Sequence, residues 1–289
     1  MKLLTRKAYA KINLGLDVLR RREDGYHELR MIMQTIDLYD KVKIELNDSG
    51  KITVKTNLPY LPTDRRNLVY KTAQIFMKRF GIRKGVKITL DKNIPVAAGL
   101  AGGSADAAAT LCLLNEIFQI GLSESELMEL GVTLGADVPY CIQMGTALSE
   151  GIGEILTPLK PIPDCFILLV KPNISVSTKY VYSNLKLTPS LKHPDIDKML
   201  LAIDKGDLYE LTRHMDNILQ TVTISKYPII TKIKNQMCEL GALTALMSGS
   251  GPTVFGIYDN ESLAENALDY FRKSGLGKQI FLTKPYWPD

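Results

Sequence analysis

A sixteen-residue stretch, IPVAAGLAGGSADAAA (94–109), constrains the fold more than any other part of this chain. Most of its residues are glycine or alanine. It follows VKITLD (86–91), whose alternation predicts a strand, and it runs into a predicted helix over 104–119. Small residues let a backbone approach another group closely, and the free N–H groups and dipole of a helix N-terminus favour an anion. The stretch is therefore either a phosphate-binding loop or a tight, closely packed turn, with Ser104 as the expected N-cap.

The rest of the pattern predicts an α+β chain. Alternation over 7–19 and 26–38 indicates a long hairpin turning at Asp24-Gly25, and KVKIEL (41–46) and KITVKT (51–56) indicate a second pair of strands. Helices are expected at 67–80, 124–134, 195–204, 207–220, 228–240 and 262–273, and further strands at 145–151, 164–170, 242–247, 253–258 and 279–283. The character of the sequence changes after Pro172, so we expect two domains, 1–160 and 161–289.

Composition excludes several classes of protein. A chain of 289 residues, 45% hydrophobic and 23% charged, is long enough to form two globular domains. No apolar run reaches the roughly 20 residues of a membrane helix, and Arg6, Lys7 and Lys11 interrupt the apolar pattern near the N-terminus. We therefore expect a cytoplasmic protein without membrane contact. The net charge of +5 is spread along the chain, which favours a small polyanionic ligand over nucleic acid.

The cysteines and histidines are scattered. Cys112, Cys141, Cys165 and Cys238 form no CxxC pair and have no histidine close to them in the sequence. Neither a disulfide framework nor a zinc site is expected, and the four cysteines are predicted to be buried thiols. No residue is assigned as a metal ligand.

Three stretches, in this order, resemble the three motifs of the GHMP kinases, a family named after galactokinase, homoserine kinase, mevalonate kinase and phosphomevalonate kinase. They are AYAKINLGLDVLRRREDGYHEL (8–29), the loop that begins at Pro95, and LMSGSGPTVFG (246–256). The resemblance implies a two-domain α+β fold with a ribosomal-protein-S5-domain-2-like N-terminal domain that binds ATP and a ferredoxin-like C-terminal domain. It places the active site in the cleft between them, and it implies ATP and Mg²⁺ as cofactors.

AKINLGL, DGYHEL and LGADVPYC together resemble one subfamily of these kinases. The resemblance implies phosphorylation of an alcohol group on a small molecule that carries a cytidine diphosphate group, in the non-mevalonate route to isoprenoid precursors. It also implies a monomer or weak homodimer that binds neither nucleic acid nor membrane.

Two residues match the catalytic positions of the subfamily. Lys11 lies beside Asn13 on the polar face of the first predicted strand, where the alternative is an ordinary solvated lysine. Asp137 follows Gly135, where the alternative is a cap for the turn before Pro139. The resemblance makes Asp137 the base that accepts the hydroxyl proton, and Lys11 the cation that keeps this carboxylate ionised.

Four residues match substrate-binding positions of the subfamily. Tyr26 and His27 lie against the cytidine in these proteins, and their residue types suit stacking and hydrogen bonding; the alternative is two side chains at the exit of a hairpin. Asn13 and Thr178 match further substrate contacts, although SVSTKYVY around Thr178 departs from the family pattern.

The expected ATP site combines the glycine-rich loop with three residues that match the adenine pocket. Asn67, Leu68 and Lys92 are those three, and each also suits a structural role, as a helix N-cap, a core leucine and a surface lysine. The loop residues are Pro95, Val96, Ala97, Ala98, Gly99, Leu100, Ala101, Gly102, Gly103, Ser104 and Ala105.

Three other functions stay open at this point. The chain is another GHMP kinase, with a mevalonate-like or homoserine-like substrate, if the Tyr26-His27 pair reads no base. It is a regulatory nucleotide-binding module if Lys11 and Asp137 perform no catalysis. It is a nucleic-acid-binding protein if its excess of lysine and arginine forms a surface that binds nucleic acid. A salt-dependent gel shift would detect such binding.

Overall fold

The computed structural model describes residues 2–188 and 191–288, which divide into two compact units. Unit 1 comprises the described residues within Met1–Ala10, Leu38–Val96 and Ala101–Gln143, and unit 2 those within Lys11–Asp37, Ala97–Leu100 and Met144–Asp289. The chain passes between the units several times, so no single boundary in the sequence separates them. The division into domains 1–160 and 161–289 stays a proposal.

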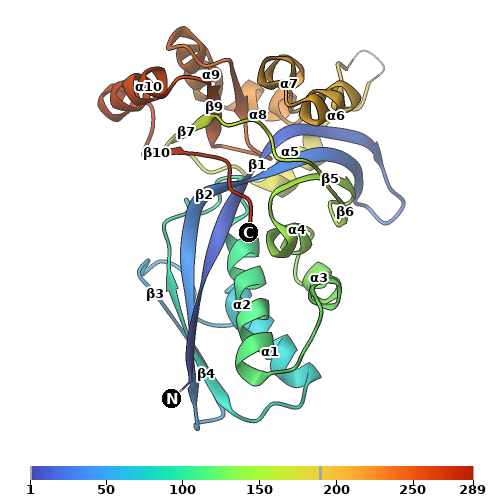
Figure 1. The fold of residues 1–289 in the computed structure, drawn as a ribbon, viewed down its shortest axis with the longest axis vertical. Coiled ribbons are helices and arrows are strands. Elements are labelled where there is room, and N and C mark those ends of the chain that lie inside the picture. Colours follow the sequence, from blue (N-terminus) through green and yellow to red (C-terminus); the bar gives the residue numbers. More distant parts are fainter. Residues whose placement is uncertain (1, 189–190, 289) are drawn as a thin grey trace. The chain divides into compact units, whose positions relative to one another are not determined.

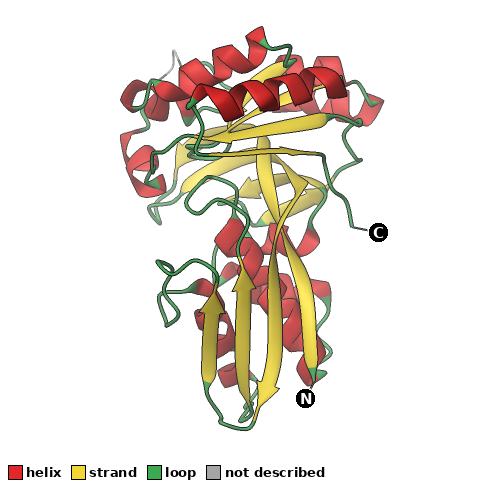
Figure 2. Ribbon diagram, turned by 90° about the vertical axis from the view of Figure 1, so that its left-hand side faces the viewer, coloured by secondary structure: helices red, strands yellow, loops and turns green. Residues whose placement is uncertain are grey.

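Unit 1 is a sheet with helices packed on one face (Figure 2). Strand β4 pairs in parallel with β3 and antiparallel with the second half of β2, while β1 pairs with β2. Valine, isoleucine and leucine from the sheet and alanine and leucine from the helices form one hydrophobic cluster. Its elements are β1 (Leu3–Arg21), β2 (His27–Asn47), β3 (Ile52–Thr56), α1 (Leu68–Arg79), β4 (Gly85–Asp91), α2 (Gly102–Phe118), α3 (Glu124–Val132) and α4 (Val138–Gln143), with β1 and β2 continuing into unit 2.

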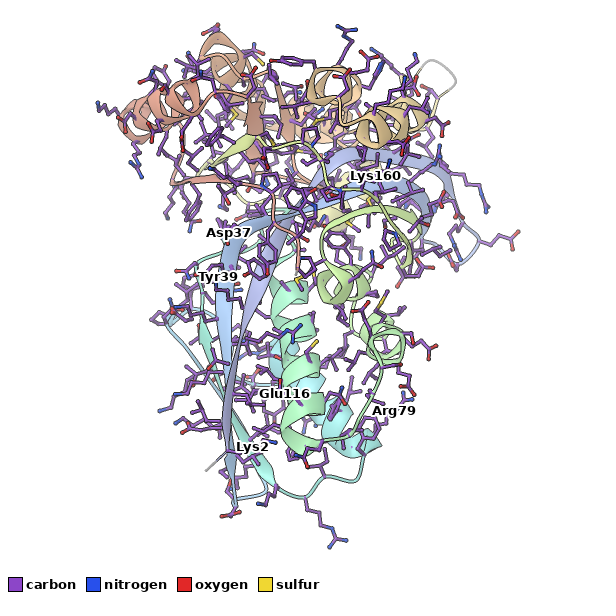
Figure 3. All side chains as sticks on the ribbon, viewed as in Figure 1. Lys2, Asp37, Tyr39, Arg79, Glu116 and Lys160 are labelled. Carbon is purple, nitrogen blue, oxygen red and sulfur yellow. The ribbon has the colours of Figure 1, made fainter. Side chains whose placement is uncertain are left out.

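The long helix α2 is central to unit 1 (Figure 1). Ala105, Ala107, Ala108 and Ala109 are buried along it, and their small side chains allow close packing against the neighbouring helix α1. At its other end the Lys2 ammonium donates to the carbonyl oxygens of Glu116 (3.5 Å) and Ile117 (3.2 Å), where a positive charge complements the helix dipole (Figure 3).

Unit 2 contains an antiparallel four-stranded sheet in the order β10-β7-β9-β8, with helices α9 and α10 packed against it. The first half of β2 pairs with β5, and β5 with β6. The elements are β5 (Thr146–Gly151), β6 (Ile155–Pro158), β7 (Phe166–Lys171), α5 (Thr178–Asn184), α6 (Ile196–Lys205), α7 (Leu208–His214), α8 (Gln220–Lys226), α9 (Ile229–Glu239), β8 (Thr244–Met247), β9 (Val254–Tyr258), α10 (Glu261–Ser274) and β10 (Gln279–Thr283). Among the described residues, no helix is both long enough and apolar enough to cross a membrane.

Most expected elements are confirmed, but the strand pairing after residue 38 is not. The predicted strands 26–38 and 41–46 form one continuous strand, β2, and 41–46 does not pair with 51–56. Strand β4 lies between them and pairs with both. Asp37, in the middle of β2, donates its N–H to the Lys284 carbonyl (2.9 Å).

The helix expected at 207–220 ends at His214 as α7, and the next helix, α8, begins only at Gln220. Between them the chain pairs with β1: Leu16 donates to the Asp216 carbonyl and accepts from the Ile218 N–H, both at 3.0 Å. These bonds replace helical ones at 216–218. The short elements β6, α4, α5 and α8 were not predicted from the sequence pattern.

The four cysteines, all among the described residues, are free thiols, as expected. Only one of the four is fully buried. Cys165 is buried, Cys112 and Cys141 are half-buried, and Cys238 is exposed. The prediction of four buried thiols is therefore wrong for three of them.

Candidate active site

The glycine-rich loop has an unusual backbone. Ala97, Gly99 and Ala101 all have positive φ angles, of 51°, 78° and 55°. An alanine in this left-handed conformation costs about 1–2 kcal/mol, and such strain persists only where the surroundings hold it. Strained backbone of this kind concentrates at ligand-binding sites, which agrees with the expected role of the loop.

Within unit 2, residues 97–100 pack against the glycine-rich turn 248–251. The Ser248 hydroxyl donates to the Gly99 carbonyl oxygen at 2.9 Å, and a Cβ atom on Gly99 would overlap the Ser248 carbonyl oxygen. Asn217 holds the same turn through its side-chain amide, which donates to the carbonyls of Met247 (2.7 Å) and Gly249 (2.8 Å). The second and third motifs therefore touch directly.

Lys11 and Asn13 lie on β1 at this same place in unit 2. The Lys11 N–H donates to the Leu100 carbonyl at 3.2 Å, and a side chain on Gly249 would begin 3.5 Å from Asn13 Oδ1. The Lys11 side chain is only 5% exposed and donates through Nζ to Asn13 Oδ1 at 2.7 Å. Because burying an ammonium is costly unless it has partners, a solvated surface lysine is excluded.

Within unit 1, the loop leads into α2 at Gly102. The helix begins two residues before the expected start, its N-cap is Ala101, and no side chain caps it. The prediction that Ser104 is the N-cap is therefore wrong; Ser104 lies in the first turn, because the left-handed Ala101 starts the helix earlier. A Cβ atom on Gly103 would meet nothing within 4 Å. The first turn thus presents N–H groups next to open space, an arrangement that suits an anion.

Asp137 lies at the start of α4 in unit 1, half-buried, and accepts the Cys141 N–H through its carbonyl at 3.1 Å. The residues after it, Val138, Pro139 and Tyr140, are buried. A proline in the first turn of a helix is favourable because its missing N–H has no partner there. The buried residues of α4 fix the position of the carboxylate-bearing residue.

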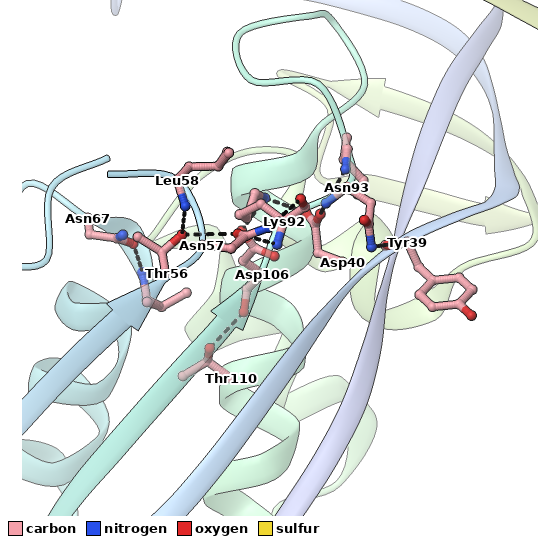
Figure 4. A network of polar contacts seen from close by, with 12 residues as sticks. Tyr39, Asp40, Thr56, Asn57, Leu58, Asn67, Lys92, Asn93, Asp106 and Thr110 are labelled. Atoms are coloured by element: carbon pink, nitrogen blue, oxygen red, sulfur yellow. Dashed lines mark hydrogen bonds and ion pairs between the residues drawn. The ribbon is translucent and has the colours of Figure 1, made fainter. Parts of the chain in front are cut away.

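The three residues expected to line the adenine pocket are all in unit 1. Asn67 is the N-cap of α1: its side chain accepts from the Val69 N–H (3.1 Å) and donates to the Pro62 carbonyl (2.7 Å). Leu68 is partly buried against the core of unit 1. Lys92 is 8% exposed, so the alternative of a surface lysine is excluded, and its ammonium pairs with Asp40 and with Asp106 (2.5 Å) (Figure 4).

Tyr26 and His27 follow the β1–β2 turn in unit 2, where Tyr26 is 60% exposed and His27 is half-buried. The His27 ring lies against the Tyr182 ring, with centroids 5.2 Å apart and planes inclined by 38°. Burial, and then the charge of Arg21, hold the pKa of His27 below its usual value. His27 is therefore a neutral imidazole at pH 7, able to donate through one ring nitrogen and accept through the other.

Thr178 begins α5, and its hydroxyl shares a hydrogen bond of 2.8 Å with the Ser250 hydroxyl. This bond joins an expected substrate residue to the third motif. The sequence analysis assigned no role to Tyr182, Ser250, Asp40 or Asp106. Ser250 and Asp106 lie inside the quoted motifs, but neither Tyr182 nor Asp40 carries a local sequence signal.

The described residues contain no group of three or more histidine, cysteine, aspartate or glutamate side chains that could hold a metal ion by themselves. Mg²⁺ bound to a nucleotide needs only one or two protein oxygens, because phosphate oxygens and water complete its shell. The Ser104 hydroxyl in the first turn of α2 fits that requirement.

Comparison with known proteins identifies the class. The model of the GHMP kinases N terminal domain matches residues 67–145, and the model of the GHMP kinases C terminal domain matches residues 199–276. The chain belongs to the GHMP kinase family. A crystal structure of a homoserine kinase from Cytophaga hutchinsonii has the same fold, with a TM-score of 0.81 at 20% identity over 99% of this chain and 95% of that one.

Within the family, this chain is similar throughout its length to proteins named 4-diphosphocytidyl-2-C-methyl-D-erythritol kinase. The protein of this name from Lachnoclostridium phytofermentans is 56% identical and covers 98% of both chains. The one from Alkaliphilus oremlandii is 50% identical over 99% of this chain and 98% of its own. A crystal structure of 4-(cytidine 5'-diphospho)-2C-methyl-D-erythritol kinase covers 99% of this chain and all of its own, with 32% identity and a TM-score of 0.83.

Proposed function

We propose that this chain transfers the γ-phosphoryl group of ATP to the 2-hydroxyl of 4-diphosphocytidyl-2-C-methyl-D-erythritol, giving the 2-phosphate and ADP, in the non-mevalonate pathway of isoprenoid precursor biosynthesis. The observation that carries the proposal is the 56% identity, over 98% of both chains, to a kinase named for this substrate. The open space at the N-terminus of α2 supports the binding of the ATP phosphates, and the His27–Tyr182 pair supports the binding of the cytidine.

The loop 95–105 binds the phosphates in this proposal. Phosphoryl transfer needs positioning and neutralisation of charge more than covalent help from the protein. The N–H groups of Gly103 and Ser104 face the phosphate oxygens, and the absence of a side chain at Gly103 leaves room for them. The Ser104 hydroxyl would hold Mg²⁺, which would screen the negative charge of the phosphates. Asn67, Leu68 and Lys92 line the adenine pocket.

Asp137 and Lys11 act on the acceptor alcohol. Asp137 accepts the proton of the 2-hydroxyl, so that the oxygen attacks the γ-phosphorus as ADP leaves. The Lys11 ammonium stabilises the negative charge that develops on the transferring group. The bond from Lys11 to Asn13 orients the ammonium, and Asn13 also contacts the substrate.

The cytidine end is read by aromatic residues of unit 2. The neighbouring rings of His27 and Tyr182 provide an aromatic surface on which a flat base stacks, and Tyr26 covers the edge of that base. A neutral His27 both donates and accepts hydrogen bonds, as a cytosine edge requires. Thr178, held by Ser250, contacts the substrate from the start of α5.

The protein acts in the cytoplasm as a monomer or weak homodimer, and it binds neither nucleic acid nor membrane. The support against nucleic acid is a net charge of only +5 over 289 residues, and the basic run Arg20-Arg21-Arg22 is followed directly by Glu23 and Asp24.

Release of ADP with four acceptors tests the proposal. The native protein, with Mg²⁺ and ATP, is offered 4-diphosphocytidyl-2-C-methyl-D-erythritol, its uridine analogue, mevalonate and homoserine. We expect turnover with the cytidyl substrate and none above background with mevalonate or homoserine. Turnover with either of these, and none with the cytidyl substrate, would show that the chain is another kinase of the family.

Asp137→Asn tests the catalytic assignment. The substitution keeps the shape of the side chain but removes the proton acceptor, so kcat falls by about 10²–10⁴ while the affinities for both substrates change only a few-fold. If Asp137 only caps α4, its replacement lowers the melting temperature, for a loss of about 1 kcal/mol, and leaves turnover near normal. Turnover and melting temperature are measured on one preparation.

A further inference from the structure

Lys92, Asp40 and Asp106 form a buried ion cluster in unit 1, at the base of the glycine-rich loop (Figure 4). Asp40 is fully buried and Asp106 is 4% exposed. Lys92 immediately precedes the segment 93–105, and Asp106 immediately follows it. The Lys92–Asp106 pair, with 2.5 Å between Nζ and Oδ2, therefore joins the two ends of this segment.

The backbone of Lys92 and of the first two residues of the segment is held at four further points. Asp40 Oδ1 accepts the N–H groups of Asn93 (2.5 Å) and Ile94 (2.8 Å). Asn57 binds the backbone of Lys92 from the other side: its Oδ1 accepts the Lys92 N–H (2.9 Å), and its Nδ2 donates to the Lys92 carbonyl (3.1 Å). These bonds fix the position of the chain at the end of β4, and the Lys92–Asp106 contact links that position to α2.

The charges of the cluster are not explained by stability. Burial opposes the charge of Lys92, but Asp106 and Asp40 outweigh it and raise its pKa, so the lysine stays protonated. Asp106 Oδ1 is buried and has no hydrogen-bond partner. Two carboxyl groups and one ammonium buried together, with one oxygen unsatisfied, cost desolvation energy that well-packed apolar residues would avoid. A role in holding the loop explains the presence of all three residues at this buried place.

We propose that Lys92 and Asp106 are positioning residues for ATP: their pair, anchored by Asp40, sets the distance between the end of β4 and the first turn of α2, and so the conformation of the phosphate loop. Neither residue needs to touch a phosphate for this. The inference rests on the proposed binding of ATP by the loop, and it assigns a function to Asp106, which acts through Lys92.

The principal test is Asp106→Leu, compared with Asp106→Asn. Leucine cannot accept from Lys92, whereas the asparagine carbonyl can. We expect Asp106→Leu to weaken ADP binding and to raise the KM for ATP, each by about tenfold, because the loop must then be ordered on binding. Its kcat at saturating ATP and its KM for the cytidyl substrate stay within about threefold, and Asp106→Asn restores ADP affinity to within about threefold of the native value.

Two further comparisons separate positioning from other roles. Calorimetry with inorganic tripolyphosphate shows the same loss as with ADP if the loop is misplaced, whereas a loss confined to ADP means that the cluster acts only on the adenine pocket and contradicts the proposal. Lys87→Met, which removes the half-buried ion pair of Lys87 on β4 with Glu45 on β2 (2.8 Å), is the control and leaves ADP affinity unchanged.

Circular dichroism establishes that each variant is folded at the assay temperature. A folded Asp106→Leu protein with native ADP affinity overturns the proposal. If Asp106→Leu does not fold, the double variant Lys92→Met with Asp106→Asn, which keeps Asp40 and its two N–H bonds, is measured in its place with the same expected loss. If the native protein binds no ADP, the proposed function fails rather than the role of the cluster.

Discussion

Gly103→Ala distinguishes an effect on ligand binding from an effect on folding, because we expect it to stabilise the fold but to weaken nucleotide binding. Gly103 lies in the first turn of α2, where a Cβ atom would meet no protein atom within 4 Å. Without nucleotide, the substitution stabilises the fold by up to about 0.5–1 kcal/mol, since alanine loses less backbone entropy in a helix. With nucleotide, the methyl group occupies the space of a phosphate oxygen. The loss of one charge-assisted hydrogen bond, about 1.5–3 kcal/mol, lowers ADP affinity about 10- to 100-fold.

Thermal unfolding of the nucleotide-free protein and calorimetry with ADP measure the two effects. Gly99→Ala is the matched control, because the added methyl group meets the chain itself: it overlaps the Ser248 carbonyl oxygen and needs a φ of 78°. That variant loses at least about 1–2 kcal/mol of stability before any ligand is added. Native ADP affinity in Gly103→Ala would refute the assignment of this space to phosphate.

Three more predictions concern the other parts of the site. Lys11→Met lowers kcat, and the double variant with Asp137→Asn is little worse than the poorer single variant, because the two act as one unit; additive losses in steady-state kinetics would contradict this. Replacing cytidine by uridine in the acceptor leaves hydrogen bonds of His27 unmade, at roughly 1–3 kcal/mol each, so kcat/KM falls about tenfold or more; equal values would exclude base reading. Burial raises the pKa of Asp106 to about 7 from its usual 3.8, despite the opposing charge of Lys92, so folding favours the protonated carboxyl. The unfolding free energy of the native protein, relative to Asp106→Asn, therefore falls as pH rises from about 4 to about 7 and then levels off; chemical denaturation over this range checks the sign.

Local sequence patterns predicted the elements whose residues determine their own conformation. The alternation of β1 indicated a strand, and α3 begins at Glu124 as expected, where Ser123 and Glu126 form a capping box. The start of α2 was mispredicted because it depends on a left-handed Ala101, and an alanine gives no local signal for that conformation. What holds Ala101 in this conformation is the surrounding structure, which the sequence pattern does not contain.

The candidate site shows the same division. Lys11 and Asn13 were expected to point the same way because they are two residues apart on a strand, and their side chains are hydrogen bonded. The contact of His27 with Tyr182 and that of Lys92 with Asp40 join residues far apart in the chain. Nothing in the local sequence distinguishes Asp40 from other aspartates or predicts that Lys92 is buried, because both facts depend on tertiary packing.

³¹P NMR of the purified protein with Mg²⁺, ATP and 4-diphosphocytidyl-2-C-methyl-D-erythritol tests the proposed transfer to the 2-hydroxyl directly. We expect a new phosphate monoester resonance, coupled in two-dimensional spectra to the 2-position of the erythritol, which grows in step with ADP while the diphosphate of the substrate stays intact. ADP formed with inorganic phosphate and no new monoester, or a monoester at another hydroxyl, would contradict it.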